Sequence, residues 1–164
     1  MSEQKKYEFT GKIKTIFGIE FKQIRAIISF GCVVAGEIGG WIECEENLSQ
    51  YGDAWVSGNA RVSGDAEVSG NAWVSGNARV SGDAEVKKDD DYMVIGGAGR
   101  YNRFTTFFKC RDKTIKVICG CFFGTIIEFR AKVKETHKGN KHEKVYLAMA
   151  DMAELQIGND EVEK

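Results

Sequence analysis

The chain has 164 residues, of which 43% are hydrophobic and 29% charged, and its formal net charge is −1. This length fits one compact domain or two very small ones, and the near-neutral charge argues against binding of long nucleic acid. No apolar run approaches the roughly 18 residues of a transmembrane helix and no signal peptide opens the chain, so we expect no membrane contact and a cytoplasmic location. The five cysteines form no CxxC pair, so we expect no disulfide framework, metal site or cofactor.

The first part of the chain is expected to form strands. Residues 1–6 are polar and are expected to be loose. Residues 7–30 are rich in Ile and Phe and are punctuated by Gly11 and Gly18, which predicts two or three strands. A helix over residues 20–28 is the competing interpretation.

Residues 31–50 keep the glycine spacing of the repeat that follows and are interpreted as an irregular first copy of it. Together with the preceding strands, residues 1–50 would then form an N-terminal cap, as short repeat arrays require. Trp41 is expected to cover the open end of the array. The apolar residues expected to point inward are Val34, Ile38, Ile42 and Leu48.

Residues 51–86 are one 18-residue unit written twice, and each unit holds three hexads of the form (Ser/Tyr)-Gly-(Asp/Asn)-Ala-x-Val. A strict repeat of this kind fixes the architecture. The Ala and the Val of each hexad are two positions apart, so in an extended chain they point to the same side and the residue between them points outward. The Gly-Asn and Gly-Asp steps are typical of turns. Three short strands and three corners predict a triangular winding in which residues 18 apart stack at about 4.8 Å.

These hexads resemble those of the hexapeptide-repeat proteins, which implies a left-handed parallel β-helix with three hexads per turn. We therefore expect a mainly β fold, a short left-handed parallel β-helix with a C-terminal α+β part. The flanking blocks 24–47, 91–95 and 119–129 are similar to those of a family of small phage- and prophage-encoded hexapeptide-repeat proteins, which often carry a transferase label. That resemblance covers most of the chain.

The outward residues of the hexads would form three columns, one of indoles, one of guanidinium groups and one of carboxylates. A head-to-tail ring that places the Arg column near the Glu column of the next chain would neutralise both charges and cover the indoles. This predicts a homotrimer, the common assembly among proteins that the repeat resembles. Solvated charged faces are the alternative interpretation. The paired positions are Trp55 with Trp73, Arg61 with Arg79, and Glu67 with Glu85.

After the repeat, residues 87–91 (Lys-Lys-Asp-Asp-Asp) are interpreted as a linker, and residues 92–164 as a C-terminal α+β module in the order β-β-β-α-α. This module holds thirteen basic and nine acidic residues, a net charge of +4. A hairpin turn over residues 111–114 is expected to join the last two strands. The three predicted strands cover residues 92–95, 104–110 and 115–121.

Two helices are predicted to end the chain. Thr125 and Glu128 have the spacing of a capping box, which indicates a helix start there, and Lys138-Gly139-Asn140 is expected to end that helix. A second amphipathic helix is predicted over residues 141–155. Its expected apolar stripe consists of Val145, Met149, Met152 and Leu155.

The most suggestive functional stretch is the glycine- and arginine-containing segment between the first two strands of this module. Glycines let backbone N–H groups approach an anion, Arg supplies forked donors and Thr supplies hydroxyls. The segment lacks the Lys-Ser/Thr ending of a P-loop, and a flexible hairpin loop is the alternative interpretation. The candidate residues for binding a small phosphorylated ligand are Gly97, Gly99, Arg100, Arg103, Thr105 and Thr106.

Catalytic chemistry is less well supported by the sequence. Hexapeptide acyltransferases generally use a His of the repeat as a base, and this repeat contains none. His137 and His142 could meet across the turn between the two helices, but exposed turn residues are the simpler interpretation. Cys119 and Cys121 precede a helix start, where a thiol is activated, but small buried side chains are favoured. We therefore predict no catalytic residue.

Taken with the phage resemblance, these features predict a non-catalytic phage-derived binding protein. We expect it to antagonise host antiviral defence in the cytoplasm of the infected bacterium. It would do so by sequestering a small anionic, nucleotide-like ligand in clefts between subunits, or by occupying a host defence protein. The alternatives are a hexapeptide acyltransferase that uses acetyl-CoA and a structural component of the virion.

Overall fold

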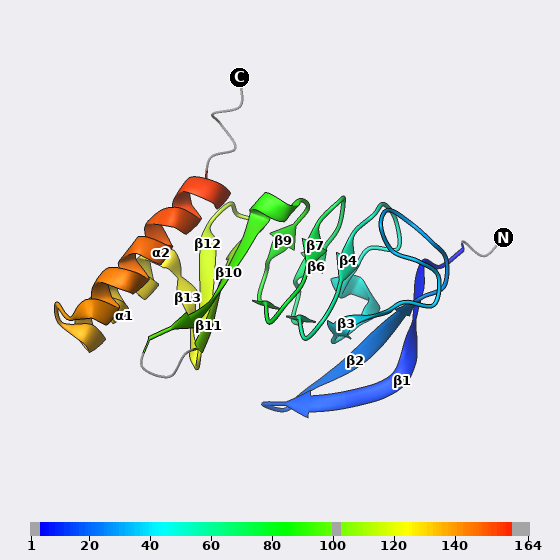
Figure 1. The fold of residues 1–164 in the computed structure, drawn as a ribbon, viewed down its shortest axis with the longest axis horizontal. Coiled ribbons are helices and arrows are strands. Elements are labelled where there is room, and N and C mark those ends of the chain that lie inside the picture. The colour runs from blue at the N-terminus through cyan, green and yellow to red at the C-terminus, as the bar shows by residue number, and fades with distance from the viewer. Residues whose placement is uncertain (1–3, 100–102, 159–164) are drawn as a thin grey trace, which may run out of the picture. The chain divides into compact units, whose positions relative to one another are not determined.

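The computed structural model describes residues 4–99 and 103–158. The chain divides into two compact units, Met1–Asp89 and Asp90–Lys164, called unit 1 and unit 2 below. Figure 1 shows strands throughout unit 1, and four strands followed by two helices in unit 2. Among the described helices, none is long and apolar enough to cross a membrane.

Unit 1 opens with a long antiparallel hairpin of β1 (Tyr7–Ile16) and β2 (Ile19–Ala26). Figure 1 shows this hairpin as an arm that extends away from the rest of unit 1. Its turn is Phe17-Gly18, where both residues have positive φ (50° and 79°). The strands predicted from residues 7–30 are therefore confirmed, and the competing helix over residues 20–28 is excluded, because the apolar alternation has the period of a strand.

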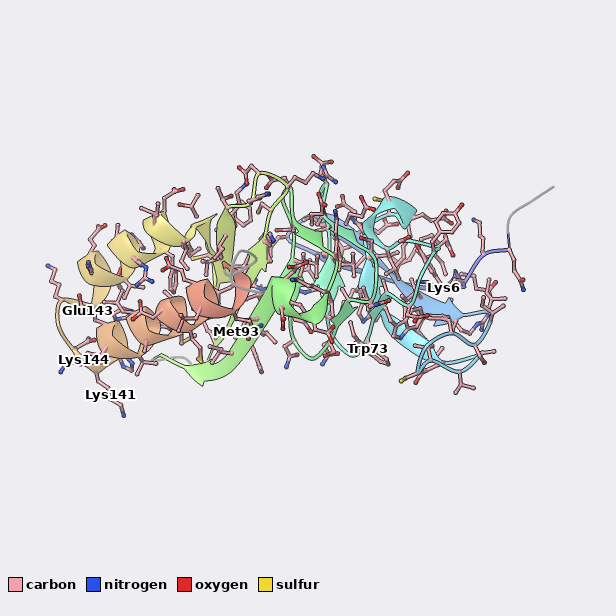
Figure 2. The ribbon with its side chains drawn as sticks, turned by 90° about the horizontal axis from the view of Figure 1, so that it is seen from above. Lys6, Trp73, Met93, Lys141, Glu143 and Lys144 are labelled. Carbon is pink, nitrogen blue, oxygen red and sulfur yellow. The ribbon has the colours of Figure 1, made fainter. Side chains whose placement is uncertain are left out.

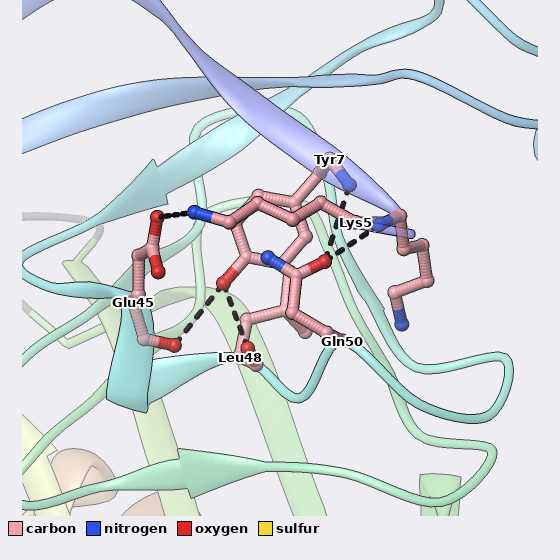
Figure 3. Close-up of polar contacts among 6 residues, drawn as sticks. Lys5, Tyr7, Glu45, Leu48 and Gln50 are labelled. Carbon is pink, nitrogen blue, oxygen red and sulfur yellow. Dashed lines mark hydrogen bonds and ion pairs between the residues drawn. The ribbon is translucent and has the colours of Figure 1, made fainter. Parts of the chain in front are cut away.

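The residues just before β1 are anchored rather than loose, which corrects the expectation for Lys5 and Lys6. Lys6 is 2% exposed, and its ammonium donates to the Ala54 carbonyl at 2.6 Å. Figure 3 shows the neighbouring contacts: the Tyr7 hydroxyl donates to the Leu48 carbonyl at 2.7 Å, and the Gln50 side-chain oxygen accepts from the Lys6 backbone N–H at 2.7 Å. These hydrogen bonds join the N-terminal segment to the start of the repeat.

The repeat forms six strands of two residues each, and its predicted register is confirmed. Every Ala and Val of the six hexads is at most 1% exposed, as expected for residues that point inward. Parallel pairs join residues 18 apart, with Trp55 opposite Trp73. The strands are β4 (Trp55–Val56), β5 (Arg61–Val62), β6 (Glu67–Val68), β7 (Trp73–Val74), β8 (Arg79–Val80) and β9 (Glu85–Val86).

The prediction of a left-handed parallel β-helix is nevertheless wrong. Mainly β structure is correct, but the strands of unit 1 are divided among several small sheets, none of which forms a solenoid. One five-stranded sheet has the order β1-β2-β3-β5-β8, so β5 and β8 continue into antiparallel strands, whereas β4-β7 and β6-β9 are separate pairs. The physical reason is that the repeat has only two copies, so each of its strands finds one partner within it, and only the β5–β8 pair is extended, by β3.

The irregular copy before the repeat contains β3 (Ile38–Ile42) and a short 3-10 helix at Glu45–Asn47. Strand β3 pairs with β5 at a separation of 20 residues rather than 18, with Trp41 opposite Arg61. Trp41 therefore lies within a sheet and does not cover an open end. Ile42 and Leu48 are buried as predicted, but Val34 and Ile38 are 66% and 50% exposed, and Val33 is buried instead.

Unit 2 contains an antiparallel sheet in the order β10-β11-β12-β13. The first three strands match the predicted ones, and the turn between β11 and β12 is fixed by Asp112, which accepts from the Thr114 backbone N–H at 3.0 Å. The fourth strand was not predicted, because its four residues lie directly against the helix start. The strands are β10 (Tyr92–Ala98), β11 (Arg103–Lys109), β12 (Ile115–Cys119) and β13 (Phe122–Thr125).

The two predicted helices are α1 (Ile126–His137) and α2 (Lys141–Ile157). The capping box is confirmed, because the Thr125 side chain accepts from the Glu128 backbone N–H at 3.2 Å and the Glu128 carboxylate accepts from the Thr125 backbone N–H. The apolar stripe predicted for α2 is partly wrong, since Met152 and Leu155 are 50% and 67% exposed. The buried face of α2 consists of Tyr146, Met149, Ala150, Ala153 and Ile157.

Candidate functional site

A cavity of about 530 Å³ lies within unit 2, between the ends of β11, β12 and β13 and the two helices. Its lining is unusual in composition, because it contains four basic or imidazole side chains and, among the described residues, no carboxylate. The remaining lining is aromatic or small and polar. The lining residues are Arg103, Cys119, Cys121, Phe122, Phe129, Lys132, Val133, Thr136, His137, Asn140, His142 and Tyr146.

The turn between the helices brings the two histidines together. Helix α1 ends at Lys138, which adopts the left-handed conformation (φ 41°), and Asn140 caps α2 by accepting from the Glu143 backbone N–H at 3.1 Å. The ring centroids of His137 and His142 are 5.6 Å apart. The prediction that these residues could meet across the turn is therefore confirmed, and the interpretation as exposed turn residues is wrong, because both are half-buried.

The aromatic part of the cavity is centred on Tyr146. Its ring is stacked with that of His137, with centroids 5.5 Å apart and an interplanar angle of 24°. Phe129 packs perpendicular to the same ring, with centroids 5.9 Å apart and an interplanar angle of 88°, and Phe122 in turn packs against Phe129. The helix spacing explains the arrangement, because His142 and Tyr146 are four residues apart and therefore share one face of α2.

A polar cluster links the cavity to the sheet. The Thr105 hydroxyl donates to the Cys119 sulfur at 3.2 Å. Burial and, to a smaller extent, the neighbouring Cys119 raise the pKa of Tyr146 to about 12, whereas Arg103 opposes the shift. The Tyr146 hydroxyl therefore stays protonated at neutral pH and can donate a hydrogen bond.

Two glycines allow the backbone to approach this cluster closely. A Cβ added at Gly99 would lie 2.0 Å from the Tyr146 hydroxyl oxygen, and one added at Gly120 would lie 2.2 Å from Arg103 Nη1. Both glycines also have positive φ, 76° and 59°. Any larger residue at either position would displace a side chain that lines the cavity.

Only part of the predicted ligand-binding set lies at this cavity. Arg103 lines it, and Gly99 contacts it through Tyr146. Thr105 and Thr106 are 0% and 1% exposed and do not line it, although the Thr105 hydroxyl contacts Cys119, which does. Gly97 is exposed in β10 with φ 73°. Arg100 lies outside the described residues.

Sequence reasoning missed Lys132 and Tyr146 and set both histidines aside. A helical signal for them was present, since Phe129, Val133 and His137 recur every four residues on one face of α1. The apolar stripe predicted for α2 consists of aliphatic and methionine side chains, so it omits Tyr146. Within the described residues, no group of three or more His, Cys, Asp or Glu could hold a metal ion.

The predicted interface columns of unit 1 have the expected register but not the expected exposure. Trp55 is 1% exposed, because Tyr7 and Phe30 pack edge-on against its ring with centroids 6.5 Å and 5.4 Å away. The expectation of two exposed indoles is therefore wrong for Trp55. Trp73 is partly exposed, and its indole N–H donates to the Ser57 hydroxyl at 2.8 Å.

The charged columns are both partly exposed. Arg61 lies opposite Arg79 in the β5–β8 pair, and Glu67 lies opposite Glu85 in the β6–β9 pair. Glu85 also forms an ion pair with Lys87 at 2.6 Å.

Neither the known protein-family models nor the curated protein sequences match this chain. The functional argument therefore depends on the residues and their geometry.

Proposed function

We propose that this protein is a non-catalytic binding protein that captures a small anionic, nucleotide-like ligand in the cavity of unit 2. The observation that supports this most strongly is the charge of the cavity. Arg103 and Lys132 supply two basic side chains, His137 and His142 add two imidazole groups, and none of the described lining residues carries a carboxylate. Such a lining favours a ligand that carries one or more phosphates.

The aromatic part of the lining supports a ligand with a planar ring. The Tyr146 and His137 rings are stacked with each other, and Phe122 adds a further aromatic side chain to the wall. A nucleobase can stack on such side chains while its phosphate contacts the basic ones, and each stacking contact contributes roughly 1–3 kcal/mol. The cavity volume of about 530 Å³ falls within the range of roughly 300–1,000 Å³ that is usual for small-molecule sites.

We propose that this binding antagonises host antiviral defence in the cytoplasm of an infected bacterium. It is supported by the resemblance of the repeat and its flanks to phage and prophage proteins. A protein that sequesters a nucleotide signal must bind that nucleotide tightly and be abundant, but it does not have to catalyse a reaction. Occupation of a host defence protein is the second form that the same role could take.

We also propose a homotrimer as the assembly. The support is that the Arg61–Arg79 and Glu67–Glu85 columns have the same 18-residue register and lie on different strand pairs of one unit. Opposite charges at equal spacing suit a head-to-tail ring of identical chains. The mass of the assembly, measured by light scattering after size exclusion, tests the number of copies.

The binding proposal is tested by thermal shift with a panel of inorganic phosphate, nucleoside monophosphates and diphosphates, cyclic nucleotides and coenzyme A. Ligands released by denaturing protein purified from phage-challenged cells are then identified by mass spectrometry. We expect stabilisation by a nucleotide, and an Arg103→Ala, Lys132→Ala double variant should bind it at least tenfold more weakly, since a charged hydrogen bond contributes about 1.5–3 kcal/mol.

Lys144→Ala is the matched control, because Lys144 is an exposed lysine in the first turns of α2 (Figure 2) and does not line the cavity. It should bind as the native protein does. The proposal fails if no nucleotide is released and none of the panel stabilises the protein, or if the double variant binds the ligand with unchanged affinity. Stabilisation by coenzyme A alone would favour acyl transfer instead.

A further inference from the structure

Unit 1 carries a pair of cations that rest on aromatic rings. The Lys14 ammonium lies 4.1 Å from the centroid of the Trp41 ring, and the Arg61 guanidinium lies 5.7 Å from the centroid of the Phe21 ring. Lys14 is in β1 of the hairpin arm and Arg61 is in β5 of the repeat, with β2 and β3 between them, and the strand register places both side chains on the same face of the five-stranded sheet. Lys14 and Arg61 are called the cationic pair below.

No carboxylate compensates the cationic pair within the described residues. Neither Lys14 nor Arg61 forms an ion pair there, and each makes its cation–π contact only. Partial burial lowers the pKa of both groups, and the charge of Arg61 lowers the pKa of Lys14 further. Two like charges that interact without a counter-charge are destabilising, and an incoming carboxylate would relieve the repulsion.

A carboxylate of the required kind is present elsewhere on the same unit. Glu67, in β6, is partly exposed and makes no ion pair with any described residue. Unit 1 as a whole contains ten basic and thirteen acidic residues, a net charge of −3, which disfavours a long polyanion as the partner of the cationic pair. A few carboxylates on another copy of unit 1 would be repelled much less than a long polyanion, so they remain a suitable partner.

The register of the repeat makes the two faces geometrically compatible. Arg61 and Glu67 are equivalent positions of consecutive hexads within one 18-residue unit, and each is followed at the same spacing by its paired residue, Arg79 or Glu85. A neighbouring copy whose Glu67 lies opposite Arg61 would therefore have its Glu85 at the spacing of Arg79, so the two columns can make two contacts together.

The hairpin arm provides apolar surface beside the cationic pair. Phe17 is 91% exposed at the tip of the arm, with φ 50°, a conformation that bulky residues seldom adopt. An exposed phenylalanine at the end of an extended arm is typical of a residue that packs into a partner. Since Lys14 is on the same arm, both contacts can be made to one neighbouring chain.

We propose that the cationic pair binds Glu67 of a second copy of this chain, with the β1–β2 arm packed against that copy. This proposal rests on the homo-oligomer proposed above and specifies its contacts. It is independent of ligand binding in unit 2, so the two can fail separately.

The test is a charge exchange within one chain. Arg61→Glu and Glu67→Arg, made singly, should each raise the dissociation constant of the assembly at least tenfold, because each puts like charges opposite one another. The double variant carries both changes, restores opposite charges at every contact, and should recover affinity to within about threefold of native. Mass is followed by sedimentation equilibrium over a dilution series.

Two further variants separate the effect of net charge from the contact that the arm makes. Lys144→Glu, in unit 2, changes the net charge by the same amount as Arg61→Glu, in unit 1, and should leave the assembly unchanged. Phe17→Ser removes the exposed ring without touching either charge and should weaken assembly with an unchanged unfolding temperature. Near-ultraviolet circular dichroism verifies that each variant is folded.

Three outcomes overturn the proposal. A native protein that is monomeric at its highest soluble concentration removes both this interface and the proposed oligomer. A native oligomer that neither single reversal weakens leaves the oligomer in place but removes this interface. A folded double variant that stays dissociated shows that Arg61 and Glu67 do not face each other, whatever the ligand titrations of unit 2 give.

Discussion

The two tryptophans of the repeat offer a direct measure of what the N-terminal segment contributes to stability. Trp55 and Trp73 occupy the same position in two nearly identical 18-residue units, yet Trp55 is 1% exposed and Trp73 is partly exposed. The difference arises from Tyr7 and Phe30, which pack on Trp55 alone. Each residue is therefore the control for the other when both are changed to alanine.

The expected effects follow from burial. A fully buried tryptophan removes about 150–250 Å² from water, and at about 25 cal/mol per Å² this corresponds to roughly 4–6 kcal/mol. Measured losses for such core truncations are about 3–5 kcal/mol. Trp55→Ala should therefore lower the free energy of unfolding by about 4 kcal/mol. Trp73→Ala should cost about 2 kcal/mol, from partial burial and the lost hydrogen bond to Ser57.

Urea unfolding followed by tryptophan fluorescence measures both effects. All three tryptophans lie in unit 1, so the signal reports on that unit, and two reporters remain in each variant. The difference of about 2 kcal/mol should separate the two midpoints by roughly 1 M urea. Equal losses for Trp55→Ala and Trp73→Ala would refute the reasoning, because they would show that the N-terminal segment does not cover Trp55 in solution.

Three further predictions concern single positions. Gly99→Ala should lower the unfolding temperature more than Gly97→Ala, because both residues have positive φ but only at Gly99 would a Cβ collide with a neighbouring hydroxyl; equal shifts by calorimetry would contradict this. Burial lowers the pKa of Lys6 from its ordinary 10.5 to about 8, so the unfolded state binds more protons between those values and stability should rise with pH across that window. Lys6→Met should abolish that rise in urea midpoints measured at pH 7.5 and pH 10, and a persistent rise would count against it. Thr125→Ala should lower the free energy of unfolding of unit 2 by about 1 kcal/mol, as loss of a helix cap does, in urea unfolding followed by far-ultraviolet circular dichroism of the helices; no loss would argue that the capping box is unimportant.

The repeat was the part of the fold that the sequence predicted best. The 18-residue register and the inward Ala and Val positions follow from a period of two within each hexad, and the structure has both. The helix start at Thr125 was equally predictable, because a capping box is a local signal. The larger architecture was not, since the pairing of β3 with β2 joins the repeat to an antiparallel hairpin through contacts that no local pattern specifies.

The candidate site was predicted only in part, for a related reason. Arg103 could be found, because it belongs to a short segment of suggestive composition. The rest of the cavity is assembled from three strands and two helices, so Lys132 and Tyr146 carry no signal until the helix faces are known. Thr105 and Thr106 show the converse error. Hydroxyl residues near a glycine-rich turn predict contacts with a ligand, but both side chains are buried.

The near-identity of the two 18-residue units has a consequence for how this chain can change in length. The units differ only at Tyr51 against Ser69 and at Asp53 against Asn71. Deletion or duplication of one whole 18-residue copy would therefore leave the order of the hexads unchanged. The elements on either side of the repeat would then contact the same residue types as before. The number of 18-residue copies can therefore change without a change in the sequence of either flank.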